Sequence, residues 1–223
     1  MSILRIAPRA ILKSRVILVP VAKSIHTSPA HSFAMSSVDQ SGSAPSFQSI
    51  GVSNTSIRKA SGVQLSSHQE VLVGSVLDLF EGRPSLRHLT LWHPTATFHD
   101  PISNAVGYDK FAAQWYGLPA LFNPITIQSH EVISAGNPIS LKLSNKYVLK
   151  GVKSEKIMDS VVDIHVAPDG KIERVEDKWN DKLPQGAFAT AFQKLNAATV
   201  PALVKVPKTQ EEDEKMQAER TSS

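Results

Sequence analysis

Four strand-like runs follow one another with no helical pattern between them, and this constrains the fold more than any other feature. Short segments containing Gly, Asn or Pro separate the runs, and one of these, Pro168-Asp169-Gly170, has the composition of a hairpin turn. Consecutive strands joined by short turns pair antiparallel. β-Branched and aromatic residues therefore predict a mainly antiparallel sheet from residues 125–133, 139–149, 156–166 and 171–179.

Helical patterns precede these strands. Residues 68–80 carry apolar side chains at helical spacing behind a serine N-cap, Ser66 or Ser67. Helices first and strands afterwards predict an α+β domain, with N-terminal helices packed on one face of a curved, mainly antiparallel sheet. A C-terminal helix is expected to dock outside that sheet. The remaining elements are expected to be a short helix from Pro84 to His88, a strand at 95–99 and helices at 108–116 and 185–196.

The first 34 residues hold five Lys or Arg and no acidic residue, since the first is Asp39. A basic, acid-free amphipathic leader predicts a mitochondrial transit peptide, recognised by the import machinery and leading to the matrix. The stretch Ser24-Ile25-His26-Thr27-Ser28 also resembles the end of many fungal presequences. A secretory signal, a disordered tail or a second start at Met35 are the alternatives.

Composition limits the remaining functions. The formal charge is +4, and without the five leader charges it is +4 − 5 = −1, so we expect no nucleic-acid partner. The chain has no Cys, which excludes disulfides and thiolate chemistry. No apolar run reaches the roughly 18 residues of a membrane span. The histidines do not have the spacing of metal ligands, so no metal and no cofactor are expected: His88, His93, His99 and His165.

These patterns divide the chain into five parts. A Ser- and Gly-rich stretch after the leader predicts a flexible linker, and the acidic run near the C-terminus predicts a charged disordered tail. The expected boundaries are 1–34 for the transit peptide, 35–67 for the linker, 68–183 for the pocket domain, 184–206 for the C-terminal helix and extension, and 207–223 for the tail.

Several short motifs resemble one family. They are the stretch from Thr95 to Pro101, a helix led by Gly107 and a last strand with Gly-Lys-Ile followed by Asp177-x-Trp179. Over residues 68–181 the chain resembles the SnoaL-like branch of the nuclear transport factor 2-like superfamily. The resemblance implies a cone-shaped fold with a pocket between sheet and helices. It also implies two classes of protein: ketosteroid isomerases, polyketide cyclases, scytalone dehydratase and epoxide hydrolases, or non-enzymatic binding modules.

Strand alternation selects the candidate site residues, because alternate side chains point to the same face. Asp177 falls on the face of Val175 and Trp179, and Asn145 and Tyr147 fall on an apolar face. An Asp in an apolar hollow has a raised pKa, which suits acid/base work. We therefore expect Asp177 and His99 to act as base and acid, and Tyr147 to donate a hydrogen bond to an oxyanion.

Aromatic side chains are expected to line the same hollow and to hold a small apolar or ring-containing ligand. Two readings stay open at this point. One is a cofactor-independent isomerase, dehydratase or cyclase, and the other is a non-catalytic module for binding or for self-association as a homodimer. A hollow of roughly several hundred Å³ above Asp177 favours the first, and a filled hollow favours the second. The expected ligand-binding residues are Trp115, Tyr116, Asn145, Trp179 and Phe98.

Overall fold

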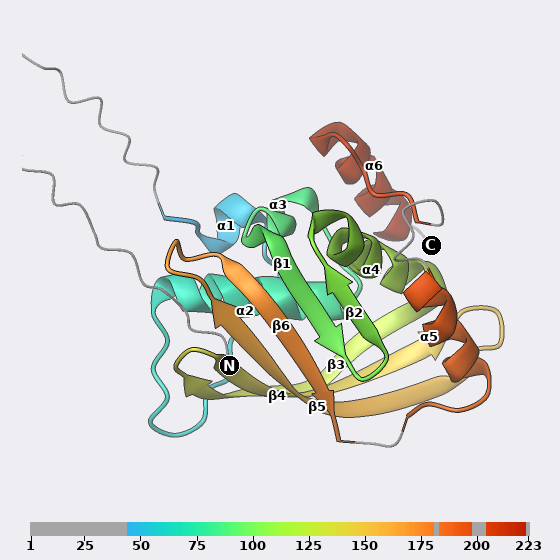
Figure 1. Ribbon diagram of the computed structural model, residues 1–223, viewed down its shortest axis with the longest axis horizontal. Helices are drawn as coiled ribbons and strands as arrows, with labels where there is room; N and C mark the ends of the chain where they lie inside the picture. The colour runs from blue at the N-terminus through green and yellow to red at the C-terminus, as the bar shows by residue number, and fades with distance from the viewer. Residues whose placement is uncertain (1–43, 181–182, 198–203, 222–223) are drawn as a thin grey trace, which may run out of the picture. The chain divides into compact units, whose positions relative to one another are not determined.

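A six-stranded open sheet lies at the centre of the structure, and the strand order is β2-β1-β6-β5-β4-β3. All neighbouring strands pair antiparallel except β1 and β6, which are parallel. The computed structural model describes residues 44–180, 183–197 and 204–221, so the predicted transit peptide lies outside the described residues. The sheet is strongly curved (Figure 1). Its strands are β1 (Trp92–Asp100), β2 (Ser103–Val106), β3 (Phe122–Ala135), β4 (Ile139–Leu149), β5 (Glu155–Val166) and β6 (Ile172–Trp179).

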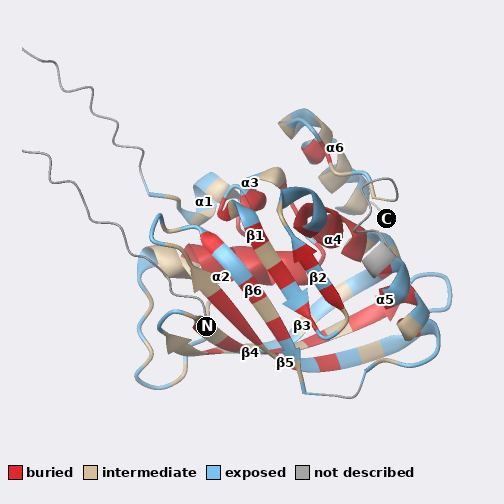
Figure 2. Ribbon diagram, in the orientation of Figure 1, coloured by how far each residue is buried: buried red, intermediate tan, exposed pale blue. Residues whose placement is uncertain are grey.

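Two long helices and the inner face of the sheet share one apolar core. The helices are α2 (Ser67–Phe80) and α4 (Tyr108–Leu121), and the short α3 (Leu86–Leu89) follows α2. A capping box between Ser66 and Gln69 starts α2, because each side chain bonds the other residue's backbone N–H. Side chains from α2, α4 and the strands contribute to one buried cluster, and Figure 2 shows buried residues along these helices and strands. The predicted class, α+β with helices on a curved, mainly antiparallel sheet and a C-terminal helix, is confirmed.

Alternation along the strands agrees with the prediction. In β5, Met158, Ser160 and Val162 are buried on the inner face, while Asp159 is exposed. The boundaries of β4 match the predicted run, whereas β3 begins at Phe122, three residues before the expected start. The short strand β2 was not predicted, since its four residues are too few to show a period. No helix among the described residues is long and apolar enough to cross a membrane.

The described part of the expected linker packs on α2. Residues 47–50 form a short helix, α1 (Phe47–Ile50), and Val52 behind it is buried. The backbone N–H groups of Ser53 and Asn54 donate to the carboxylate of Asp78 at 2.7 and 3.2 Å. Contacts of this kind hold the segment in place, so residues 44–66 differ from the free linker that their composition predicts.

The C-terminal segment also differs from the prediction. Instead of a solvated tail, it contains α6 (Gln210–Thr221). Asp213 has 0% exposure, its Oδ1 accepts the hydroxyl of Tyr116 at 2.7 Å, and its Oδ2 accepts the N–H of Leu86 at 2.8 Å. Arg220 donates to the carbonyl oxygen of Pro84 at 3.0 Å. These partners are remote in sequence, so composition alone could not indicate that the helix docks.

Candidate functional site

A small, partly enclosed chamber of about 30 Å³ lies against the inner face of the sheet. Strands β1, β4, β5 and β6 contribute to its wall, as do α4 and α5 (Ala187–Ala197). Six of the predicted site residues line it: Asp177, Tyr147, Asn145, Trp115, Trp179 and Phe98. They come from four different elements, and alternation on the strands brings their side chains to one place.

Asp177 is the central ionisable group of this chamber, with 7% of its surface exposed. Its Oδ2 accepts the indole N–H of Trp179 at 2.7 Å, and its Oδ1 has no hydrogen-bond partner among the described residues. Burial and then the charge of Asp100 raise the pKa of Asp177 to about 7, although hydrogen bonds from Ser160 and Trp179 act in the opposite direction. A carboxyl group with this pKa exchanges a proton readily near neutral pH.

Asp100 faces the same chamber, and an Asp that precedes a Pro is also a common turn residue. It is both, because its Oδ1 accepts the N–H groups of Ile102 and Ser103 at 2.8 and 2.6 Å and so shapes the turn into β2. Burial raises the pKa of this carboxyl as well. The signal was present in the sequence: if Phe98 points inward, the residue two positions later does too.

The prediction for His99 is wrong in its placement. His99 is exposed, and it pairs with Glu176 on the neighbouring strand. Since Phe98 and Asp100 point into the chamber, the side chain between them points to the outer face. Asp100 therefore occupies the position at which we expected His99.

Four buried polar atoms around the chamber have no hydrogen-bond partner among the described residues. Such atoms are uncommon in folded proteins, and they point to a water or a ligand that completes them. The orientation of Asn145 is fixed, because its Nδ2 donates to the carbonyl oxygen of Phe80 at 2.8 Å, which leaves Oδ1 unpaired. Sequence reasoning missed Gln114, whose polar character gave no sign of burial. The four atoms are Asp177 Oδ1, Asn145 Oδ1, Gln114 Oε1 and Trp115 Nε1.

Tyr147 supplies a hydroxyl group to the chamber. It lies on the inner face of β4 with 6% exposure. Burial and the charge of Asp177 raise the pKa of Tyr147, so the phenol keeps its proton at neutral pH. A protonated phenol in a dry site is a suitable donor to a developing oxyanion.

Helix α5 forms part of the chamber wall, to which it contributes Phe192 and Leu195. We expected this helix to dock outside the sheet. Instead it packs beside α4 with Phe188, Ala191, Phe192 and Leu195 buried.

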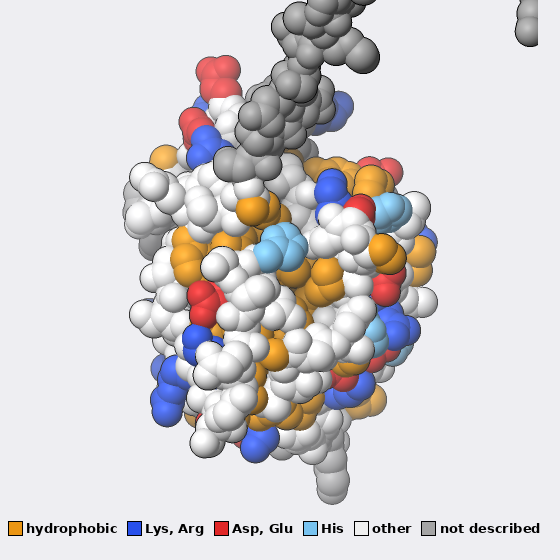
Figure 3. Space-filling view, turned by 90° about the vertical axis from the view of Figure 1, so that its left-hand side faces the viewer, with side chains coloured by type: hydrophobic (Ala, Val, Ile, Leu, Met, Phe, Trp, Pro, Cys, Tyr) orange, Lys and Arg blue, Asp and Glu red, His pale blue; other side chains and the backbone are white. Residues whose placement is uncertain are grey.

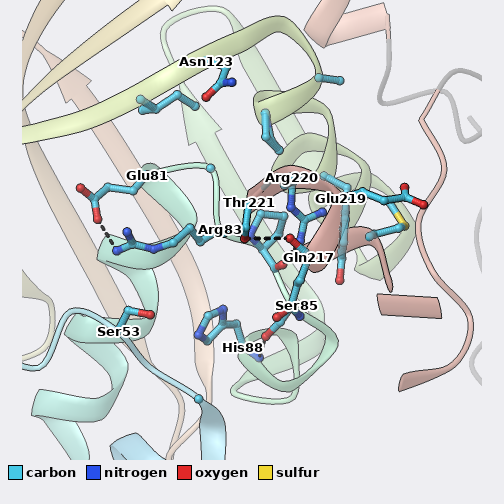
Figure 4. A pocket seen from close by; sticks show the side chains of 18 of the residues that line it. Ser53, Glu81, Arg83, Ser85, His88, Asn123, Gln217, Glu219, Arg220 and Thr221 are labelled. Atoms are coloured by element: carbon cyan, nitrogen blue, oxygen red, sulfur yellow. Dashed lines mark hydrogen bonds and ion pairs between the residues drawn. The ribbon is translucent and has the colours of Figure 1, made fainter. Parts of the chain in front are cut away.

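Tyr116 does not belong to the chamber. Consecutive residues of a helix point about 100° apart, so Trp115 faces the chamber and Tyr116 faces α6. It lines a second, open hollow of about 710 Å³ beside α3 and α6 (Figure 4). The charged groups there are largely paired already, for example Arg83 with Asp78 and with Glu81. We therefore regard the chamber as the candidate site.

Charged side chains are dispersed over the described part of the chain. No group of three or more His, Asp or Glu residues there could hold a metal ion. On the face shown in Figure 3, described acidic and basic side chains are interspersed. A basic patch of the kind that binds nucleic acid is not visible on it.

Comparison with known proteins gives a family for the central part. The model of the SnoaL-like domain matches residues 75–175, whereas no curated protein matches the chain significantly. A steroid Δ-isomerase from Pseudomonas aeruginosa is 16% identical, with a TM-score of 0.45 over 64% of this chain and 96% of that one. An NTF2-like protein of unknown function from Exiguobacterium sp. 255-15 is 15% identical, with a TM-score of 0.42 over 50% and 99%.

A putative polyketide cyclase from Silicibacter sp. is 14% identical, with a TM-score of 0.41 over 49% of this chain and 88% of that one. Similarities at this level say nothing of activity. The family model agrees with the resemblance that the motifs predict: residues 75–175 match the SnoaL-like domain.

Proposed function

We propose that the chamber binds a small, partly apolar molecule and moves a proton on it without a cofactor, as in an isomerisation, dehydration or cyclisation. One observation carries this proposal. Asp177 is buried in a small, mostly apolar chamber, its pKa is about 7, and its Oδ1 has no hydrogen-bond partner among the described residues. A carboxyl group in that state can take a proton from a carbon or oxygen acid and return it elsewhere.

The other chamber residues have roles that follow from their chemistry. The protonated phenol of Tyr147 donates to the oxygen on which negative charge develops. The unpaired amide oxygen of Asn145 accepts from a hydroxyl group and orients the ligand. Asp100 keeps the proton affinity of Asp177 high through its negative charge. Trp115 and Trp179 provide flat apolar walls.

Ligand screening with the full chain tests the proposal. The wild type and the nearly isosteric variants Asp177→Asn and Tyr147→Phe are screened by thermal shift against fractionated metabolites, and each compound that binds is followed for conversion. We expect compounds that stabilise all three proteins, that Asp177→Asn does not convert, and that Tyr147→Phe converts about 10²–10³-fold more slowly than wild type. Equal stabilisation without turnover in any protein would remove the acid/base role.

A non-catalytic module is the second candidate, and the filled chamber favours it. Phe98, Trp115 and Trp179 line a space of about 30 Å³, which holds about one water molecule. In this reading the domain binds a partner or a second copy through the outer face of its sheet. Analytical ultracentrifugation tests whether the domain binds a second copy. A homodimer that is lost when Lys142 or Ile157 on the outer face is replaced by Glu would support it, and a monomer at high concentration would contradict it.

We also propose that residues 1–34 direct the protein to the mitochondrial matrix through the import machinery. Their basic, acid-free composition supports this address. A fluorescent protein fused behind residues 1–40 should accumulate in mitochondria. A variant with Arg5, Arg9 and Lys13 replaced by Gln should stay in the cytosol. Diffuse signal from the unmodified fusion would contradict the proposal.

A further inference from the structure

Helix α5 contributes to a different apolar cluster from the rest of the domain. Its buried residues Phe188, Phe192 and Leu195 pack with Tyr147 and Met158. None of its described residues belongs to the main core, which is built from α2, α4 and the sheet. The polar groups of the chamber lie where the two clusters meet. Removing α5 would therefore open the chamber and leave the main core intact.

The ring of Phe192 lies among three other aromatic rings. Its centroid lies 5.3 Å from that of Phe122, 5.5 Å from that of Trp179 and 6.3 Å from that of Tyr147. Rings at these separations attract one another through edge and offset contacts. Phe192 also lines the same chamber as Asp177 and Asn145.

The side chain of Phe192 makes apolar contacts but leaves nearby polar atoms without hydrogen bonds. A phenyl ring cannot pair with Asp177 Oδ1, Asn145 Oδ1 or Trp115 Nε1, and all three buried atoms lack a partner within the part of the chain that the structure describes. Buried polar atoms that stay unpaired destabilise the state that contains them. A ring that also carries hydroxyl groups would keep the aromatic contacts and complete these hydrogen bonds.

From this mismatch we infer that α5 is a displaceable plug, in which Phe192 and Leu195 hold the place of a planar, hydroxylated ring compound. Binding of that compound releases α5 from the chamber while the main core stays folded. The inference rests on the proposed function only in that both use the same chamber. A plug formed by α5 explains why the volume of a ligand site is only about 30 Å³.

Thiol labelling tests the release of α5 without any ligand or turnover. The chain has no Cys, so a single introduced Cys is its only thiol. Met158→Cys lies in the chamber beneath α5, and Val162→Cys lies on the same face of β5 within the main core. Both native side chains are buried, with 5% and 0% exposure. The two positions are matched in burial. They differ in that α5 packs over position 158, whereas position 162 lies in the main core.

The full-length variants are exposed to a soluble aromatic disulfide reagent under native conditions, and each rate is corrected with the variant's own global unfolding constant. Local opening makes Met158→Cys react at least about 100-fold faster than Val162→Cys. Adding Phe192→Ala should accelerate Met158→Cys by about tenfold or more, and adding Gln193→Ala, an exposed position of α5, should not. Equal corrected rates at both positions would overturn the plug.

A second measurement addresses the ligand. Phe192→Ala should bind naphthol at least about tenfold more tightly than wild type, because the competing ring is gone, and should bind its methyl ether more weakly than naphthol. No gain over wild type, or no preference for the free hydroxyl, would overturn the ligand assignment. Fast labelling of Met158→Cys together with unchanged turnover in Asp177→Asn would support the plug and contradict only the acid/base role of Asp177.

Discussion

The carboxyl groups of Asp100 and Asp177 face the same chamber from neighbouring parallel strands. Strands β1 and β6 pair at His99 and Glu176, so the next residue on each strand points to the inner face. The negative charge of Asp100 adds to burial in raising the pKa of Asp177. Two buried carboxyl groups in one chamber do not ionise independently, and their titrations are coupled.

Asp177→Asn should change how stability depends on pH. The folded pKa of about 7 lies above the ordinary value of 3.8, so the folded wild type holds the proton more tightly than the unfolded chain. Its stability therefore falls as pH rises from about 4 to about 7, and the full penalty is present above pH 7. At pH 8 the variant should be more stable than wild type by a few kcal/mol, at roughly 1.4 kcal/mol per pKa unit.

Chemical denaturation at pH 4, 6 and 8 measures this difference. Asp159→Asn removes a carboxyl from the exposed face of the neighbouring strand β5 and is the matched control. The stability of Asp159→Asn should change with pH in the same way as that of wild type. A variant at position 177 that shows the same loss of stability toward pH 8 would mean that this carboxyl is hydrated in the folded protein.

Asp100→Asn should lower the pKa of Asp177. The amide oxygen can still accept the N–H groups of Ile102 and Ser103, so the turn into β2 is kept, but the negative charge is lost. Carbon-13 NMR of the labelled Asp177 carboxyl gives its titration directly. A titration at an unchanged pH would show that burial alone accounts for the shift.

Gly74→Ala decides whether residues 47–54 dock on α2. In a helix this substitution normally stabilises by roughly 1 kcal/mol. Here the added Cβ would lie 2.5 Å from the carbonyl oxygen of Asn54 and 2.8 Å from Cγ1 of Val52. We expect a loss of about 1–3 kcal/mol and faster hydrogen exchange of residues 47–54. A gain in stability would show that the segment does not pack there.

Asp213→Ala should release α6. It removes the acceptor of the Tyr116 hydroxyl and of the Leu86 N–H, and buried bonds to a charged group contribute about 1.5–3 kcal/mol each. Hydrogen exchange of residues 210–221 should become fast. Glu214→Ala is the control, since its pair with Arg87 at 3.4 Å is exposed and contributes little. Equal protection of α6 from hydrogen exchange in both variants would show that Asp213 does not hold this helix in place.

The sheet and much of the site were accessible from local patterns. A strand repeats every two residues, so knowing that Leu141 and Leu143 are apolar was enough to place Asn145 and Tyr147 on the same inner face. The same rule placed Asp177 beside Val175. Applied to Phe98, the same rule places Asp100 on the inner face and His99 on the outer face, as the structure shows.

Other features depend on contacts that no local pattern contains. Asp213 looks like one acid in a charged run, and only Tyr116 and Leu86, 97 and 127 residues away, make it a buried anchor. Residues 47–54 look like linker, and only α2 gives them a surface to cover. In both cases burial comes from side chains that are close in space and far apart in the chain.

What the amino-acid order determined by itself is the periodicity of each element and therefore which side chains share a face. What only the tertiary structure decided is how much space those faces enclose. Phe192 fits the pattern of an ordinary amphipathic helix, yet its ring lies among Phe122, Tyr147 and Trp179 and lines the chamber. Periodicity follows from backbone geometry within a few residues, whereas a cavity volume is the sum of contacts across the whole domain.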